Sequence, residues 1–431
     1  MRRSRVMVWV VFAIFFEISF VTNILGPIIP DMIQSFHLSL FAAALMPFAF
    51  FIAYGVFSIP AGFLVERWRE KSVIVAMFSV SLGGALLFAW MHMFTAAIVS
   101  LFLIGGSMAA LQVAINPLLR VAGGEENFAF NSAFAQLIFG VASFISPQVY
   151  SYVVRSLEGR GPMSPLLAPL AEIVPVSMRW ISMYWIFAVV IGAMLLVLAL
   201  LRFPDVERKV DESAGTLAMY RELLAKPVVW LYFLSVFFYV GSEQGTANWI
   251  SEFLRRYHGF DPQTTGAWAV GWFWGLMTAG CFIGMILLKL LDSRVVLGIF
   301  TACSLLSLTL ALFGPAQVAR LAFPCVGLFA SVMWPIVISL GLNSVEKYQG
   351  ALAGILCTGI MGGAVMPLVE GRIADAFGLR AGMCILYCTF GWIFGVTLWA
   401  RPLINNQRPG GRAALQDQGV DAEGARPIDS R

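Results

Sequence analysis

The chain has 431 residues, of which 59% are hydrophobic and only 12% are charged, and its formal net charge is +4. Soluble domains average roughly 45–50% apolar and about 25% charged residues. This composition therefore excludes an ordinary soluble enzyme, a disordered chain and a secreted disulfide scaffold, and it indicates a polytopic membrane protein. The six cysteines lie in apolar stretches without metal-ligand spacing, and the small net charge gives no argument for nucleic-acid binding.

Twelve apolar runs are long enough to cross a hydrocarbon core, which takes about 20 helical residues. They lack the period-two alternation of strands, which excludes a barrel. The predicted spans are 7–29, 40–64, 72–91, 95–119, 128–153, 179–201, 227–253, 266–288, 295–313, 319–342, 350–369 and 380–400. The fold class is therefore an all-α polytopic membrane protein with two six-helix bundles, residues 1–201 and 227–402. A cytoplasmic linker, 202–226, joins the bundles, and a disordered cytoplasmic tail, 403–431, follows them.

The basic residues are unevenly divided between the loops. If the N-terminus is cytoplasmic, the cytoplasmic side holds 20 of the 28 Lys and Arg residues and the other side holds eight. Because cytoplasmic loops carry an excess of basic residues, both termini are predicted to be cytoplasmic. The first apolar run continues to about Ile29 without a small-residue cleavage site, which favours a retained span over a signal peptide. We expect a multi-pass protein of the inner (plasma) membrane.

The loop after the second predicted span has the sequence Gly62-Phe-Leu-Val-Glu66-Arg67-Trp-Arg69-Glu-Lys71. It resembles the major facilitator signature G-x-x-x-[DE]-R-x-x-[RK]-[RK], at the place in the topology where that signature belongs. The resemblance implies a cytoplasmic gate, in which the glycine allows close helix approach and the charged residues pair across the gate. The alternative interpretation is a basic loop that only satisfies the charge rule.

Further stretches resemble the fucose–galactose–glucose:proton symporter family over nearly all of residues 10–400. The resemblance implies two bundles that rock around a central sugar site, with transport coupled to protons. The matching motifs are Phe50-Phe-Ile-Ala-Tyr54-Gly55, Ser58-Ile-Pro60-Ala-Gly62, Asn116-Pro117, Tyr239-Val-Gly241-Ser-Glu243 with Trp249, Met333-Trp-Pro335, and Gly359 to Pro367 with Ala374-Asp375.

Two acidic positions of that family are replaced in this chain. Family members carry an aspartate in the first helix shortly after an asparagine, and here the segment Asn23-Ile-Leu-Gly26 has glycine instead. They also carry a glutamate four residues before the Asn-Pro pair, and here that position is Gln112. Neither replacement can titrate. Coupling to H⁺, coupling to Na⁺ and uniport therefore all stay open.

Two other acids lie inside predicted spans, Glu17 in the first and Glu243 in the seventh. A charge at the bilayer centre costs roughly 2.5–3.5 kcal/mol, so ionisable residues inside a span usually have a function. Both are ion-coupling candidates, and the alternative for each is a structural carboxylate. Glu370 and Lys289 lie near predicted span ends, where they are expected to reach the membrane interface.

Sugar binding requires amides, hydroxyls and aromatic faces. Pairs such as Gln112 with Asn116, and Gln244 with Asn248, share one helix face through their i, i+4 spacing. The alternative is that the amides hold helices together and the tryptophans form interfacial belts. The substrate-binding candidates are Asn23, Gln112, Asn116, Asn131, Gln136, Glu243, Gln244, Asn248, Trp272 and Trp334.

The sequence therefore predicts a carrier for a small sugar, a hexose or a deoxyhexose, and not an enzyme. No phosphate-loop motif is present and no catalytic set of residues lies at one membrane depth. We expect no cofactor, metal or nucleic acid, and a monomer in the lipid bilayer. The alternatives are a major facilitator exporter of drugs or amphipathic metabolites, and a sugar sensor that does not transport.

Overall fold

Each long apolar run forms a helix in the computed structural model, which describes residues 4–124, 127–201, 203, 217–345 and 347–401. Helices are required because a backbone surrounded by lipid must satisfy its own hydrogen bonds. Eleven helices of the described chain are long and apolar enough to span a membrane, and Pro227–His258 makes a twelfth when it is counted with the preceding helix, from which it bends by 84°. The prediction of twelve spans in an all-α protein is confirmed.

The first half of the chain, called the N-half here, contains six spans. Its second and third spans together form one long helix, α3, which is interrupted by the non-helical backbone of Arg69 (φ 65°). The elements are α1 (Arg5–Thr22), α2 (Leu25–Phe36), α3 (Leu40–Trp90), α4 (Phe94–Gly123), α5 (Phe128–Leu157), η2 (Pro165–Leu167), α6 (Ala168–Ile173), η3 (Val176–Ile181) and α7 (Ser182–Leu200).

The second half, called the C-half, also contains six spans, and α8 precedes it. Several of these spans are made of two or more shorter helices. The elements are α8 (Leu217–Leu224), α9 (Pro227–His258), η5 (Pro262–Gly266), α10 (Ala267–Leu290), α11 (Ser293–Phe313), α12 (Ala316–Ala330), α13 (Met333–Leu342), α14 (Gln349–Thr358), η6 (Gly359–Met361), α15 (Gly362–Phe377), α16 (Leu379–Met383) and α17 (Leu386–Trp399).

Two of the spans are broken four residues before a proline. The first span divides into α1 and α2 at Asn23, and the tenth divides into α12 and α13 at Ser331. Pro27 and Pro335 have no N–H to donate to the carbonyls of Asn23 and Ser331, so the helical ladder is interrupted there. The expectation of continuous helices over 7–29 and 319–342 is therefore corrected. Interrupted helices are where transporters of this architecture place their sites.

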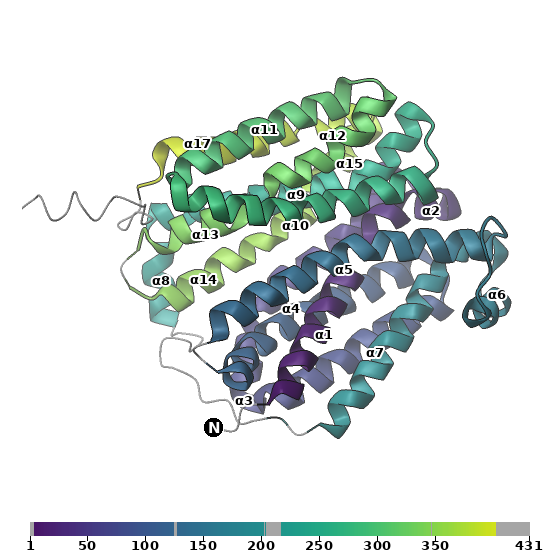
Figure 1. Ribbon diagram of the computed structural model, residues 1–431, viewed down its shortest axis with the longest axis horizontal. Coiled ribbons are helices and arrows are strands. Elements are labelled where there is room, and N and C mark those ends of the chain that lie inside the picture. The colour runs from purple at the N-terminus through teal and green to yellow at the C-terminus, as the bar shows by residue number, and fades with distance from the viewer. Residues whose placement is uncertain (1–3, 125–126, 202, 204–216, 346, 402–431) are drawn as a thin grey trace, which may run out of the picture.

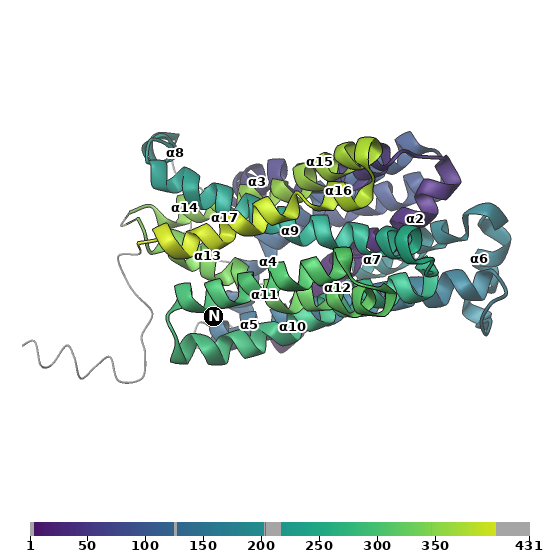
Figure 2. The same cartoon turned by 90° about the horizontal axis from the view of Figure 1, so that it is seen from above.

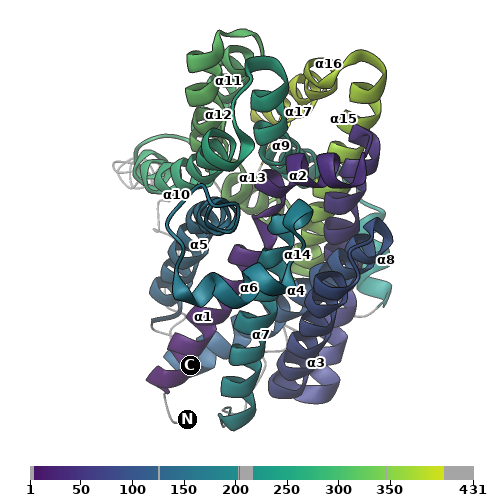
Figure 3. The ribbon, with the colours of Figure 1, turned by 90° about the vertical axis from the view of Figure 1, so that its right-hand side faces the viewer.

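The helices of the N-half form one group and those of the C-half form another. The long helices run in the general direction of the molecule's longest axis (Figures 1 and 2). Seen from the right-hand side of Figure 1, α11, α12, α16 and α17 lie at the top and α1, α3 and α7 at the bottom, with α2 and α14 between them (Figure 3). The helices of the two halves converge toward the end that carries α2 and splay apart toward the end that carries α8 (Figure 1). We call these ends the α2 end and the α8 end.

Glycines allow close packing within each half, as α3 and α4 illustrate. A Cβ at Gly105 of α4 would overlap the Phe50 carbonyl of α3, whereas a Cβ at Gly83 of α3 would have no atom within 4 Å. Small residues at helix contacts replace the hydrophobic driving force that is missing inside a bilayer.

The packing predicts opposite effects of one substitution at these two glycines. We expect Gly105→Ala to destabilise the protein by about 1–3 kcal/mol, because the added methyl forces the helices apart. Gly83→Ala is the matched control, and it should be neutral or slightly stabilising because alanine favours helix. Thermal unfolding of the purified protein in detergent measures both, and equal midpoints for the two variants would contradict the assigned contact.

Candidate functional site

A polar and aromatic cluster lies beside the break between α12 and α13. The Tyr239 hydroxyl donates to Glu243 Oε2 at 2.5 Å, and the rings of Tyr239 and Trp334 lie 6.1 Å apart. The Cys281 thiol lies 3.6 Å from the Ser331 carbonyl oxygen, which the proline leaves without its helical partner. The cluster therefore joins α9, α10 and α13 at the broken helix, and it contains two of the predicted site residues, Glu243 and Trp334.

The other predicted residues of α9 share a helix face with Ala247, whose carbonyl packs on Gly26 of the N-half. Gln244 Nε2 donates to Glu243 Oε1 at 3.0 Å, and Gln244 also lies against Gly363, which in turn contacts Phe51 of α3. Asn248 is 2% exposed, and its Nδ2 has no hydrogen-bond partner among the described residues. Glu243, Gln244 and Asn248 are thus brought together on one helix near the seam between the halves.

The amide pair of α4 has a different environment. Gln112 is half-buried, Asn116 is exposed, and Asn116 Nδ2 donates to the main-chain oxygen of Gln112 at 3.1 Å. This contact is within one helix turn and uses one of the two amide protons, so it leaves most of the hydrogen-bonding capacity of Asn116 unused. An amide inside a span is stable there when it faces protein or water instead of lipid.

The remaining predicted amides do not gather around this cluster. Asn23 is buried and donates to Ser143 Oγ at 2.8 Å, which ties α1 to α5. Asn131 lies against Gly123 where α4 ends, and Gln136 is exposed on α5. Trp272 packs edge-on against Phe144 of α5 with ring centroids 5.2 Å apart. Their role in binding stays a prediction.

Two buried carboxylates accept no hydrogen bond of normal geometry among the described residues, and the Trp249 indole interacts more loosely with one of them, Glu370. Glu17 is 2% exposed and Glu370 is 0% exposed, and all four of their oxygens lack hydrogen bonds. The expectation that Glu370 reaches the membrane interface is wrong. Its helix continues to Phe377 instead of ending at 369, which places Glu370 two turns inside the span and against Gly245 of α9.

The predicted cytoplasmic gate motif lies at the α8 end, where α3 turns at Arg69. Lys71 Nζ donates to the Leu201 carbonyl at 2.7 Å and to the Ala199 carbonyl at 3.3 Å, so it closes the C-terminus of α7. Gly62 is half-buried and Arg67 and Arg69 are exposed, and the side chain of Glu66 lies outside the described residues. Lys71 therefore binds its own half in this conformation.

At the α2 end, the halves meet through side chains that sequence reasoning did not select. Gln263 Nε2 of the C-half donates to Glu158 Oε1 of the N-half at 3.1 Å, and Tyr150 donates to Asp31 within the N-half. Gln148 lies against Gly271 of α10. Asp31 and Gln148 could have been selected from the sequence, because each is a polar residue inside an apolar helix.

Gly26, which stands where the related family has an acid, also lies at the seam. A Cβ at this position would overlap the carbonyl oxygen of Ala247, because α2 packs directly on the backbone of α9. The glycine at this position therefore permits the close packing of α2 on α9, in addition to removing a titratable group. In this conformation no side chain fits at position 26.

The sequence model of the Major Facilitator Superfamily matches residues 11–363. The chain belongs to the Major Facilitator Superfamily. The predicted fold class and the prediction of a transporter instead of an enzyme are both confirmed.

The glucose/galactose transporter of Brucella abortus biovar 1 (strain 9-941) is 29% identical over 402 residues, which cover 89% of this chain and 92% of the relative. The L-fucose-proton symporter of Escherichia coli (strain K12) is 26% identical over 387 residues, covering 85% and 86%.

Solved structures of this superfamily show the same fold. FucP, a transporter solved in the outward conformation, is 22% identical and superposes with a TM-score of 0.64, covering 93% of this chain and all of that one. A bacterial homologue of the human lysosomal transporter Spinster, solved inward-facing and unoccupied, is 15% identical with a TM-score of 0.74, covering 91% and 96%.

The contact at Gly26 predicts that restoring an acid there prevents the α2 end from closing. Spin labels at Met91 and Gln317, both exposed near the ends of spans at the α2 end, report the distance between the halves when the six native cysteines are replaced. We expect Gly26→Asp to lengthen this distance, because the side chain has no space against the Ala247 carbonyl. Gly26→Ala should also lengthen the distance, because its methyl meets the same carbonyl, and Gly192→Ala, at a glycine with no atom near its Cβ position, is the matched control. An unchanged distance in Gly26→Asp would contradict the assigned packing.

Proposed function

We propose that this chain transports a hexose or a deoxyhexose across the membrane by alternating access. The observation that carries the proposal is the cluster of Tyr239, Glu243 and Trp334 at the proline break of α12–α13. Two relatives that match most of the chain are named as transporters of glucose and galactose and of L-fucose, which supports a sugar of this size.

The cluster has the chemistry that a sugar ring requires. A carboxylate accepts hydrogen bonds from two adjacent hydroxyls, and Gln244 beside Glu243 adds both a donor and an acceptor. The face of the Trp334 indole covers the apolar C–H surface of a pyranose. We propose that Glu243, Gln244, Asn248 and Trp334 bind the sugar from the C-half.

The N-half contributes the amides of α4 to the same site. Asn116 is exposed and Gln112 is half-buried, so both can exchange their present contacts for sugar hydroxyls. We assign a weaker part to the four other predicted residues. Asn23 is held by its hydrogen bond to Ser143, Asn131 packs against Gly123, and Trp272 packs against Phe144 of α5. Gln136 is exposed on α5.

We propose that the α8 end is cytoplasmic, so that this conformation faces inward. The assignment rests on the 20 of 28 basic residues that belong to that side. Residues 1–201 and 227–402 move as two bodies around the site, and the chain acts as a monomer in the inner (plasma) membrane. The proposed tail, 403–431, and most of the proposed linker, 202 and 204–216, lie outside the described residues.

For energy coupling we propose a proton carried by Glu243. Both acids of the related family are absent, and Glu243 is a half-buried acid inside a span that contacts the proposed sugar site. Protonation would remove its charge and change its hydrogen bond with Tyr239, which links the proton to the sugar. Glu17 is the second candidate, because its carboxylate has no described partner.

Uptake into proteoliposomes tests this function. We expect labelled glucose, galactose or L-fucose to accumulate above the outside concentration when a pH gradient is imposed, and only to equilibrate without one. Glu243→Gln should keep counterflow exchange and lose accumulation, whereas Glu222→Gln on α8, with an exposed side chain, should keep both. Accumulation driven by Na⁺ alone, or by no gradient, would overturn the proton assignment. Absence of any sugar exchange would overturn the proposed function.

The stacking role of Trp334 makes a separate prediction. We expect Trp334→Ala to raise the KM for sugar about tenfold, because an aromatic contact of this kind is worth on the order of 1 kcal/mol beyond the buried area it adds. Trp334→Phe should raise the KM less. Trp90→Ala is the matched control, because that ring is 72% exposed at the end of α3. Equal KM values for Trp334→Ala and the control would exclude ring stacking at this position.

A further inference from the structure

The first turn of α3 in the N-half rests on the last turns of α15 in the C-half. Three residues of α15 make this contact, each in a different way. Gly371 lies so close to Leu40 that a Cβ would come within 2.8 Å of the Leu40 carbonyl oxygen. The Arg372 guanidinium lies 5.9 Å from the centre of the Phe41 ring. The third residue is Asp375, whose carboxylate reaches the helix backbone.

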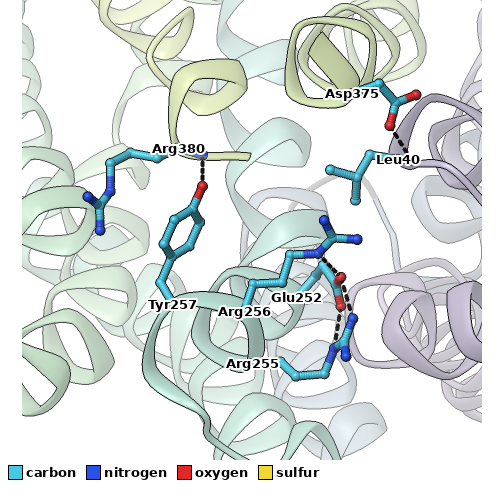
Figure 4. Close-up of polar contacts among 7 residues, drawn as sticks. All are labelled: Leu40, Glu252, Arg255, Arg256, Tyr257, Asp375 and Arg380. Carbon is cyan, nitrogen blue, oxygen red and sulfur yellow. Dashed lines mark hydrogen bonds and ion pairs between the residues drawn. The ribbon is translucent and has the colours of Figure 1, made fainter. Parts of the chain in front are cut away.

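Asp375 supplies hydrogen bonds that α3 cannot make for itself. The Leu40 N–H donates to Asp375 Oδ1 at 2.7 Å (Figure 4). The Phe41 N–H donates to Oδ2 at 3.1 Å. These amides belong to the first turn of the helix, where N–H groups have no intrahelical partner. Ser39 satisfies only the next one, the Ala42 N–H, at 3.1 Å. The carboxylate also lies at the positive end of the helix dipole.

The segment that carries Asp375 is held in place by its own half. The Arg380 main-chain N–H donates to the Tyr257 hydroxyl at 3.0 Å, and the Arg380 guanidinium lies 4.6 Å from the centre of the Tyr257 ring (Figure 4). Tyr257 belongs to α9, where Glu252 binds the guanidinium groups of Arg255 and Arg256. The turn after α15 is therefore fixed to α9, so Asp375 moves with the C-half.

The spacing of this segment also occurs at the opposite end of the protein. Gly371 and Asp375 are four residues apart, as are Gly62 and Glu66 of the gate motif at the α8 end. This spacing places a glycine and an acid on one helix face, so that the glycine permits contact and the acid can reach the neighbouring helix. The first pair joins the two halves in this conformation.

We propose that residues Gly371 to Asp375 form a latch that holds the α2 end closed, with the Asp375 carboxylate capping the first two N–H groups of α3 in the other half. Opening the α2 end removes the cap from Leu40 and Phe41 and leaves their N–H groups to water. A cap shifts an equilibrium by about fivefold, which is strong enough to bias the two conformations and weak enough to release. Asp375 is thus a positioning residue for the transport cycle, and the proposal does not depend on which substrate is carried.

The test measures the distance between spin labels at Met91 and Gln317 in the full chain, reconstituted in lipid nanodiscs without substrate. We expect Asp375→Ala to raise the ratio of open to closed molecules at the α2 end about fivefold. Asp375→Asn keeps one acceptor oxygen and should give an intermediate ratio. Asp292→Ala is the matched control, because Asp292 accepts from the Arg294 N–H at 2.9 Å and caps α11 within one half.

A graded shift in the order Ala, Asn, wild type, with the control unchanged, supports the latch. An unchanged ratio in Asp375→Ala, or an equal shift in Asp292→Ala, overturns it. If Asp375→Ala does not fold, the ratio of open to closed molecules is measured in Asp375→Asn and Arg372→Leu and compared with that of the control. Thermal unfolding provides a second readout, because a purely structural cap would lower the midpoint of Asp375→Ala and Asp292→Ala alike without moving the ratio.

Discussion

The two halves are in contact where a glycine lets one helix lie directly on the backbone of another. Gly26 of α2 lies on the Ala247 carbonyl of α9, Gly371 of α15 lies on the Leu40 carbonyl of α3, and Gly271 of α10 lies on the Phe144 carbonyl of α5. Inside a bilayer the hydrophobic effect does not hold helices together, so close backbone approach and its dispersion energy must do so. Such contacts exist only while the helices are in register, which suits an interface that has to separate and close again.

The same close packing decides the environments of four acids that lie on the spanning helices. Glu252 binds two arginines, Glu243 binds Tyr239 and Gln244, and Glu17 and Glu370 accept no hydrogen bond of normal geometry among the described residues. A buried carboxylate without a partner is costly, so each of these environments has a consequence for transport or for stability. These four glutamates thus differ in role because the helices around them differ.

Local sequence signals predicted the elements well where a single helix is involved. Long apolar runs predicted the twelve spans, because hydropathy depends only on composition within about 20 residues. The predicted end of the span that contains Glu370, residue 369, comes too early, because the polar residues Glu370, Arg372 and Asp375 make a buried helix resemble a loop. The breaks at Asn23 and Ser331 were missed, although Pro27 and Pro335 stand four residues later.

Local hydropathy and short motifs in the sequence were enough to predict the number of spans, the two bundles and the superfamily. They also predicted Glu243 and Trp334 as site residues, and the structure places both beside Tyr239. The packing of distant helices, in contrast, brings the Asn23 amide to Ser143, 120 positions away, and brings Asp375 to the start of a helix 335 positions away. The physical reason is that a hydrogen bond requires two groups within about 3 Å. Between helices, that distance is set by packing, which no local pattern records.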